Sequence, residues 1–279
     1  MIRLKRTIPR NLKHWLKKIY WRLQDGLLKI QGQKDPLLPP KALIESIGGN
    51  FAGVGEEFFG YFKDLCDLKP DQRILDVGCG TGRMAVPLTQ YLNSAGSYHG
   101  FDIMPECVDW CRSQITSRFS NFQFQLADIY NLAYNPGGKV KASDYIFPYP
   151  DQSFDLVILT SVFTHMFPPD VDHYLSEISR VLKPDGKSLI TFFLINDLSL
   201  ELIRAGKSKL DINHDRGQYF TANLETPEEA IGLPENFVLA RYNQYRLKVQ
   251  QPIRYGVWSG RLDGLSFQDI LIGVKETRA

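Results

Sequence analysis

Short apolar runs alternate with segments of helical periodicity along most of the chain. The runs expected to form strands lie at residues 74–77, 97–102, 122–126, 156–160 and 188–193. Between them apolar residues recur every three or four positions, as in residues 84–92 and in a segment that begins near Asp170. Strands that alternate with helices predict an α/β fold with a largely parallel sheet. A helix around 235–245 and strands near 247–251 and 269–275 are expected to complete it.

The stretch from Arg73 to Arg83 carries the strongest chemical signal. Glycine occupies alternate positions after the first apolar run, at Gly78, Gly80 and Gly82, and helical spacing follows. Glycine lets the backbone turn tightly and approach a ligand closely. The following helix start offers free N–H groups to ligand oxygens. Strand, glycine turn and helix together indicate a nucleotide site.

Two nucleotide families are compatible with these glycines. The segment from Gly80 to Ala85 fits the G-x-G-x-x-A pattern of dinucleotide-binding oxidoreductases that use NAD(P). The string ILDVGCGTGR instead resembles the first motif of class I S-adenosylmethionine (SAM) methyltransferases, acidic-x-G-x-G-x-G. Asp76 favours the second family, because its carboxylate could bind a methionyl ammonium and would gain nothing from a pyrophosphate. A membrane-associated scaffold with a vestigial SAM site is a third interpretation.

The resemblance covers residues 70–195 and, more weakly, 235–276, and it includes the turn R-V-L-K-P-D-G at 180–186. It implies a Rossmann-like, doubly wound seven-stranded sheet, mostly parallel with an antiparallel last strand and helices on both faces. It also implies SAM as cofactor, S-adenosylhomocysteine as product and in-line methyl transfer. The implied cofactor contacts are Asp76, Gly78, Cys79, Gly80, Gly82, Asp102, Ile103, Met104, Asp128, Ile129 and Thr160.

Three carboxylates in this set have distinct expected roles. Asp76 would face the methionyl group and Asp128 the adenine amino group. Asp102 ends the second strand, 20 residues after Gly82, where a carboxylate can accept hydrogen bonds from both ribose hydroxyls. Asp102 can also serve as the N-cap of the next helix, and the two roles are compatible.

His165 follows the fourth strand, and the first and fourth strands flank the site in this fold. It is the candidate catalytic residue. As a general base it would take a proton from a substrate hydroxyl or amine. As a structural residue it would hydrogen-bond backbone and shape the pocket. The sequence leaves both roles open.

Residues 196–234, here called the cap, do not fit the minimal fold and resemble a substrate-specific insertion. We expect a small-molecule acceptor, with oxygen favoured as the methylated atom and a lipid-linked or sugar substrate as an option. No nucleic-acid partner is expected. The candidate substrate contacts are His214, Tyr255, Trp258 and Arg261.

Charged residues are unevenly distributed along the chain. Residues 1–22 contain eight Lys/Arg and no acid, whereas the remainder carries 25 Lys/Arg against 31 Asp/Glu, a formal −6. Residues 11–31 combine this basic character with an apolar face, which suits packing on the catalytic domain or another subunit, peripheral membrane contact, or, less well, nucleic acid. We expect a basic extension and linker at 1–40 and the methyltransferase domain at 41–279.

No apolar run is long enough to span a membrane, and no signal-peptide pattern begins the chain. We therefore expect a cytoplasmic protein, with an option of peripheral contact at the inner face of a membrane. The four cysteines form no C-x-x-C pair, so free thiols are expected. No His/Cys cluster has metal-ligand spacing, and no metal is expected.

Overall fold

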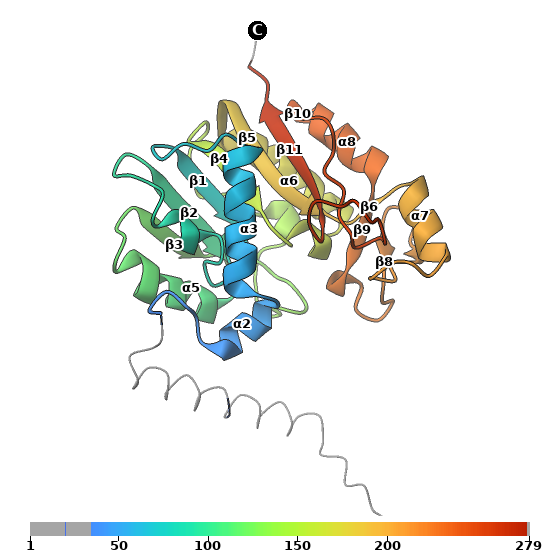
Figure 1. Cartoon of the computed structure of the whole chain (residues 1–279), viewed down its shortest axis with the longest axis horizontal. Helices are drawn as coiled ribbons and strands as arrows, with labels where there is room; N and C mark the ends of the chain where they lie inside the picture. Colours follow the sequence, from blue (N-terminus) through green and yellow to red (C-terminus); the bar gives the residue numbers. More distant parts are fainter. Residues whose placement is uncertain (1–19, 21–34, 278–279) are drawn as a thin grey trace, which may run out of the picture.

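The computed structural model describes Tyr20 and residues 35–277. A seven-stranded sheet with the order β10-β11-β5-β4-β1-β2-β3 forms its centre (Figure 1). Its strands are β1 (Arg73–Val77), β2 (Ser97–Asp102), β3 (Phe122–Leu126), β4 (Phe154–Leu159), β5 (Leu182–Phe192), β10 (Leu247–Val249) and β11 (Asp269–Lys275). β11 runs antiparallel to both neighbours, and the other pairings are parallel. This confirms the predicted Rossmann-like sheet with an antiparallel last strand.

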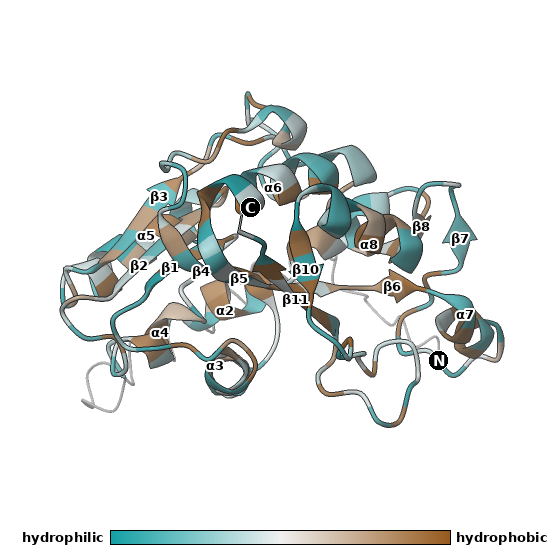
Figure 2. Cartoon of the chain, turned by 90° about the horizontal axis from the view of Figure 1, so that it is seen from above, coloured by the Kyte–Doolittle hydropathy of each residue, from teal (hydrophilic) through white to brown (hydrophobic). Residues whose placement is uncertain are grey.

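Helices cover both faces of this sheet (Figure 2). α6 (Pro168–Val181) and α8 (Glu235–Gln244) pack on one face, against strand residues such as Leu75 and Val77. α3 (Phe51–Asp64), α4 (Ala85–Leu88) and α5 (Pro105–Cys111) pack on the other, against residues such as Ile74. Successive strand residues point to opposite faces, so a strand buried on both sides needs an uninterrupted apolar run. The run at 156–159 in β4 meets that need, whereas β1 is interrupted by the buried Asp76.

α4 is shorter than the apolar spacing of residues 84–92 predicts. It ends at Leu88, where the Thr89 hydroxyl and the Thr89 N–H both donate to the Val86 carbonyl, at 2.7 and 3.1 Å. α5 ends at Cys111 and continues as a π-helical turn, Arg112–Thr116. A 3-10 turn, Ala142–Asp144, lies in the long loop after β3, and helix α2 (Lys41–Ile47) precedes α3.

The cap and the two residues that precede it contain a second sheet that the sequence did not reveal. Its order is β6-β9-β8-β7, with β6 (Leu194–Ile195), β7 (His214–Asp215), β8 (Phe220–Thr221) and β9 (Ile231–Pro234). These strands are too short to show a period of two. With α7 (Asp197–Arg204) they enclose a separate core around Ile195, Ile203 and Trp258, beside the main sheet in Figure 1.

Asp269, the first residue of β11, joins the cap to the main sheet. Its buried carboxylate accepts hydrogen bonds from Leu194 N, Gly256 N and Trp258 Nε1, each at 2.7 Å. Burial raises the pKa of Asp269 to about 6, and the three donors oppose that rise. Three segments distant in sequence therefore meet at one carboxylate.

The predicted basic helix of residues 11–31 lies, apart from Tyr20, outside the described residues, and the predicted domain boundaries stay predictions. Within the described part of the chain, no helix has the length and apolar character needed to cross a bilayer. The four cysteines are buried free thiols.

Replacing Asp269 by alanine is expected to lower the free energy of unfolding by about 3 kcal/mol, because three buried donors lose their acceptor. Urea denaturation checks this value. Asp263→Ala, at an exposed position in the neighbouring loop, is the control and should change stability by less than about 0.5 kcal/mol. Equal effects of the two substitutions would contradict the role of Asp269.

Candidate cofactor and active site

The turn after β1 requires glycine at each of its three glycine positions. Gly78, Gly80 and Gly82 have φ values of 78°, 51° and 75°, a region that other residues rarely adopt. A Cβ on Gly78 would lie 2.4 Å from Val162 Cγ2, and one on Gly82 would lie 2.6 Å from Ile115 Cδ1. The turn is thus tightly enclosed on both sides, and its backbone faces a cavity without intervening side chains.

Asp102 ties this turn to the end of β2. Its Oδ2 accepts a hydrogen bond from Gly80 N at 2.7 Å, and its Oδ1 accepts one from Met104 N at 2.9 Å. Burial raises the pKa of Asp102, and these backbone donors oppose the rise. Each carboxylate oxygen can accept a second hydrogen bond. Asp102 also lines the cavity, so it can receive two neighbouring hydroxyl groups there.

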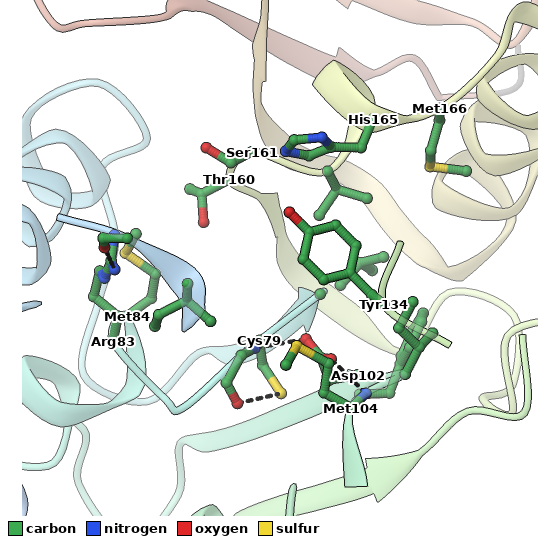
Figure 3. Close-up of a pocket in the computed structure, with 18 of the residues that line it drawn as sticks. Cys79, Arg83, Met84, Asp102, Met104, Tyr134, Thr160, Ser161, His165 and Met166 are labelled. Atoms are coloured by element: carbon green, nitrogen blue, oxygen red, sulfur yellow. Dashed lines mark hydrogen bonds between the residues drawn. The ribbon is translucent and has the colours of Figure 1, made fainter. Parts of the chain in front are cut away.

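The cavity has a volume of about 640 Å³ and lies at the carboxyl ends of β1, β2 and β4 (Figure 3). This is where open α/β sheets bind ligands. Eight of the predicted cofactor contacts line it: Gly78, Cys79, Gly80, Asp102, Ile103, Met104, Ile129 and Thr160. A backbone cradle, a carboxylate and apolar walls at Ile103 and Ile129 match the phosphate-free nucleoside of SAM.

Three other predicted cofactor residues do not line the cavity. Gly82 is part of the turn but faces Ile115 and Cys111. Asp76 is completely buried, accepts a hydrogen bond from the Tyr98 hydroxyl, and has a pKa raised to about 7 by burial. Its Oδ1 has no partner among the described residues, so a contact with the methionyl ammonium stays a prediction. Asp128 is 54% exposed and accepts from Lys139 N at 3.3 Å, and its adenine contact also stays a prediction.

His165 lines the cavity from the 3-10 turn Phe163–His165 that follows β4. Its Nδ1 lies 2.7 Å from the backbone carbonyl of Glu228 in the cap. A carbonyl can only accept, so Nδ1 carries the proton and donates it. Nε2 of the neutral ring is then left with a lone pair. Burial lowers the pKa of His165, which favours this neutral form at pH 7.

None of the four predicted substrate contacts lines the cavity. For Trp258 the prediction is corrected: its side chain is completely buried, it packs on Phe193, and its indole N–H donates to Asp269. His214 is exposed on β7, away from the cavity wall.

Tyr255 and Arg261 stack on each other, with the guanidinium carbon 4.1 Å from the ring centroid. Tyr255 donates to Glu235, and Arg261 donates to Asn196. These two hydrogen bonds join the last loop to the start of α8 and to the first residue of the cap.

Residues that the sequence did not single out complete the wall. Tyr134 comes from the long loop at 130–150 and meets His165 edge-on at a centroid distance of 5.8 Å. Phe267 and Gln268 immediately precede β11, and Gln268 Nε2 donates to the Ser161 hydroxyl at 2.9 Å. The length of the loop at 130–150 is the sequence feature that could have indicated Tyr134.

Within the described residues, no cluster of His, Cys, Asp and Glu has the arrangement of a metal site.

The fold and this cavity define a class I SAM-dependent methyltransferase. A family model described as a methyltransferase domain matches residues 68–222, more than half of the sequence. The chain belongs to this methyltransferase family, which decides against the NAD(P) oxidoreductase interpretation.

Solved structures agree with the fold. A SAM-dependent methyltransferase from Methanosarcina mazei superposes with a TM-score of 0.51 at 22% identity, covering 76% of this chain and 95% of that one. A Pyrococcus horikoshii protein gives a TM-score of 0.55 at 17% identity, covering 80% and 90%.

Curated relatives have several acceptors in their names. A tRNA N(3)-cytidine methyltransferase of Mus musculus is 27% identical over 75% of this chain and 51% of its own length. A demethylmenaquinone methyltransferase of Lactobacillus johnsonii is 34% identical over 46% of each chain. An aklanonic acid methyltransferase of a Streptomyces species is 29% identical over 50% of this chain and 57% of its own. The chain thus spans about half the length of the curated relatives it matches.

Replacing Asp102 by alanine is expected to weaken S-adenosylhomocysteine binding by about 10- to 100-fold, because hydrogen bonds to a charged group are lost. Isothermal titration calorimetry checks this. Asp109→Ala removes the same charge from an exposed position in α5 and should leave affinity unchanged. If Asp102→Ala binds as tightly as the unaltered protein, the ribose assignment is wrong, and a vestigial site becomes the better interpretation.

Proposed function

We propose that this protein transfers a methyl group from SAM to an oxygen of a small, largely apolar acceptor. The observation that carries the proposal is the state of His165. Its Nδ1 is committed to the Glu228 carbonyl at 2.7 Å, so the remaining ring nitrogen is an acceptor at the cavity wall. A neutral imidazole in this state is suited to take a proton from a hydroxyl.

The chain's residues divide the work between binding and proton transfer. Asp102 and the backbone of the glycine turn would hold the nucleoside, with Ile103, Met104 and Ile129 along its base. When bound there, SAM supplies an electrophilic methyl group. His165 would accept the proton of the acceptor hydroxyl. The cavity walls would hold the methyl group and that hydroxyl in place.

The apolar part of the cavity wall indicates the chemistry of the acceptor. Met166, Tyr134 and Phe267 contribute apolar or aromatic side chains to it, and the cavity volume is in the range of drug-sized ligand sites. A lipid-linked acceptor fits these walls better than a free sugar, which would need several polar partners. Peripheral contact of residues 1–31 with a membrane, in an otherwise cytoplasmic protein, would suit such a substrate.

RNA is the competing acceptor, because a relative that aligns with 75% of this chain acts on tRNA according to its name. The formal charge of −6 beyond residue 22 disfavours it, since phosphate contacts dominate nucleic-acid affinity. Incubation with methyl-labelled SAM, total RNA and a solvent extract of cells separates the two. Label is expected in the extract, and label confined to RNA would overturn the small-molecule proposal.

His165→Asn tests the base directly. The asparagine amide can replace the Nδ1 donor toward Glu228 but offers no basic nitrogen. With the labelled acceptor, kcat/KM is expected to fall about 100-fold or more.

The unaltered enzyme should lose activity as pH falls, because protonation of His165 removes the base. The pKa of His165 is lowered from its ordinary value, so this loss is expected below about pH 6.5. Near-normal activity of His165→Asn, with the same acid limb, would assign His165 a structural role.

A further inference from the structure

Exposed apolar side chains border the cavity on two loops. The loop after β3 contributes Tyr130 and Tyr134 to the cavity wall, and the loop before β11 contributes Phe267. These three side chains are between 42 and 45% exposed, so they lie where the cavity meets solvent. The exposed large apolar side chains of the two loops are here called the rim: Tyr130, Leu132, Tyr134, Leu262, Leu265 and Phe267. Exposed apolar residues that gather at a ligand site are typical of an interaction surface.

The sheet brings the two rim loops to one edge. The first loop follows the carboxyl end of β3. β11 runs antiparallel, and its first residue, Asp269, pairs with Phe192 at the end of β5. The loop before β11 therefore also emerges beside the carboxyl ends of the parallel strands. Because β3 and β11 lie on opposite sides of β1 and β4 in the sheet, the two loops reach the cavity from two sides.

The distribution of charge indicates what the rim contacts. Residues 130–138 contain no charged side chain, and Asp263 is the one charged residue from 262 to 268. The chain beyond residue 22 carries a formal −6, so an anionic surface can be approached only by a face with few acids. Residues 1–22, in contrast, hold eight Lys/Arg and no acid. A bilayer with anionic headgroups offers hydrocarbon to the rim and negative charge to this basic segment.

The basic segment is attached at the same end of the molecule as the rim. The described chain continues from residue 35 into α2, which lies at the lower end of the molecule in Figure 1. Ile47 ends α2 and lines the cavity together with Gly48 and Gly49. Residues 23–40 span at most about 60 Å when extended, so residues 1–22 and the rim can contact one flat surface together.

We propose that the rim docks on an anionic bilayer and that the acceptor enters the cavity from the lipid side, an inference that rests on the proposed function. Leu262 and Leu265 then enter the boundary between headgroups and acyl chains. Tyr130 and Tyr134 combine an apolar ring with a hydroxyl, the chemistry favoured at a membrane surface. With Phe267 they join the apolar cavity wall to the hydrocarbon, so a lipid-linked acceptor enters without exposing its apolar part to water.

Flotation of the full chain with lipid vesicles tests this docking. The unaltered protein is expected to bind phosphatidylcholine vesicles that contain phosphatidylglycerol, less strongly as salt rises. The double variant Leu262→Asp/Leu265→Asp should weaken this binding about 10-fold or more. It should keep its affinity for S-adenosylhomocysteine, because neither side chain lines the cavity. Leu198→Asp/Leu224→Asp adds the same charge at exposed positions in the cap and should bind vesicles normally.

Full vesicle binding by the rim variant, or none by the unaltered protein, would overturn the proposal. So would self-association of the unaltered protein, measured by light scattering, that the rim variant loses while vesicle binding stays unchanged. If the double variant does not fold, Leu262→Asp alone decides: reduced vesicle binding supports the proposal and unchanged binding overturns it.

The labelled product distinguishes failure of this docking from failure of the proposed function. Label found only in a water-soluble small molecule would overturn entry from the lipid side and leave methyl transfer to a small acceptor standing. Label confined to RNA would overturn the proposed function itself, whatever the vesicles show.

Discussion

The carboxylate of Asp102, held by the backbone N–H groups of Gly80 and Met104, is the interaction on which the site depends. β1 and β2 are parallel neighbours, so their carboxyl ends meet at one edge of the sheet. Gly78 N and Cys79 N both donate to the Phe101 carbonyl, at 2.9 and 3.1 Å, which brings the turn against the end of β2. Asp102 then fixes the turn while keeping acceptor capacity toward the cavity.

The cap and the last loop shape the opposite side of that cavity. A backbone carbonyl of the cap determines which nitrogen of His165 carries the proton. Asp269 holds the start of the cap and the loop before β11 to the main sheet. The main sheet thus supplies the glycine turn and Asp102, whereas longer-range contacts from the cap and loops orient His165 on the other side of the cavity.

The sequence predicted the strands well, and eight of the eleven expected cofactor contacts lie on the cavity wall, because both depend on local features. The segments at 97–102, 122–126 and 269–275 match β2, β3 and β11 at both ends. β3 alternates Phe with Gln and buries one face, whereas β11 is buried along most of its length. The two-residue strands of the cap carry no such signal. Trp258 was misassigned because its partner, Asp269, approaches through a fold-level contact that no local pattern indicates. Phe267 likewise reaches the cavity through a long-range contact, whereas the length of the loop at 130–150 was a signal for Tyr134.

We propose that the glycine turn and Asp102 position the methyl donor beside His165. A crystal structure of the protein with S-adenosylhomocysteine tests it most directly. Both ribose hydroxyls are expected at hydrogen-bond distance from the Asp102 carboxylate, with the amino-acid portion along Gly78 and Gly80. The sulfur is expected to face the side of the cavity that His165 lines. A ligand bound outside this cavity, or a ribose that does not reach Asp102, would contradict it.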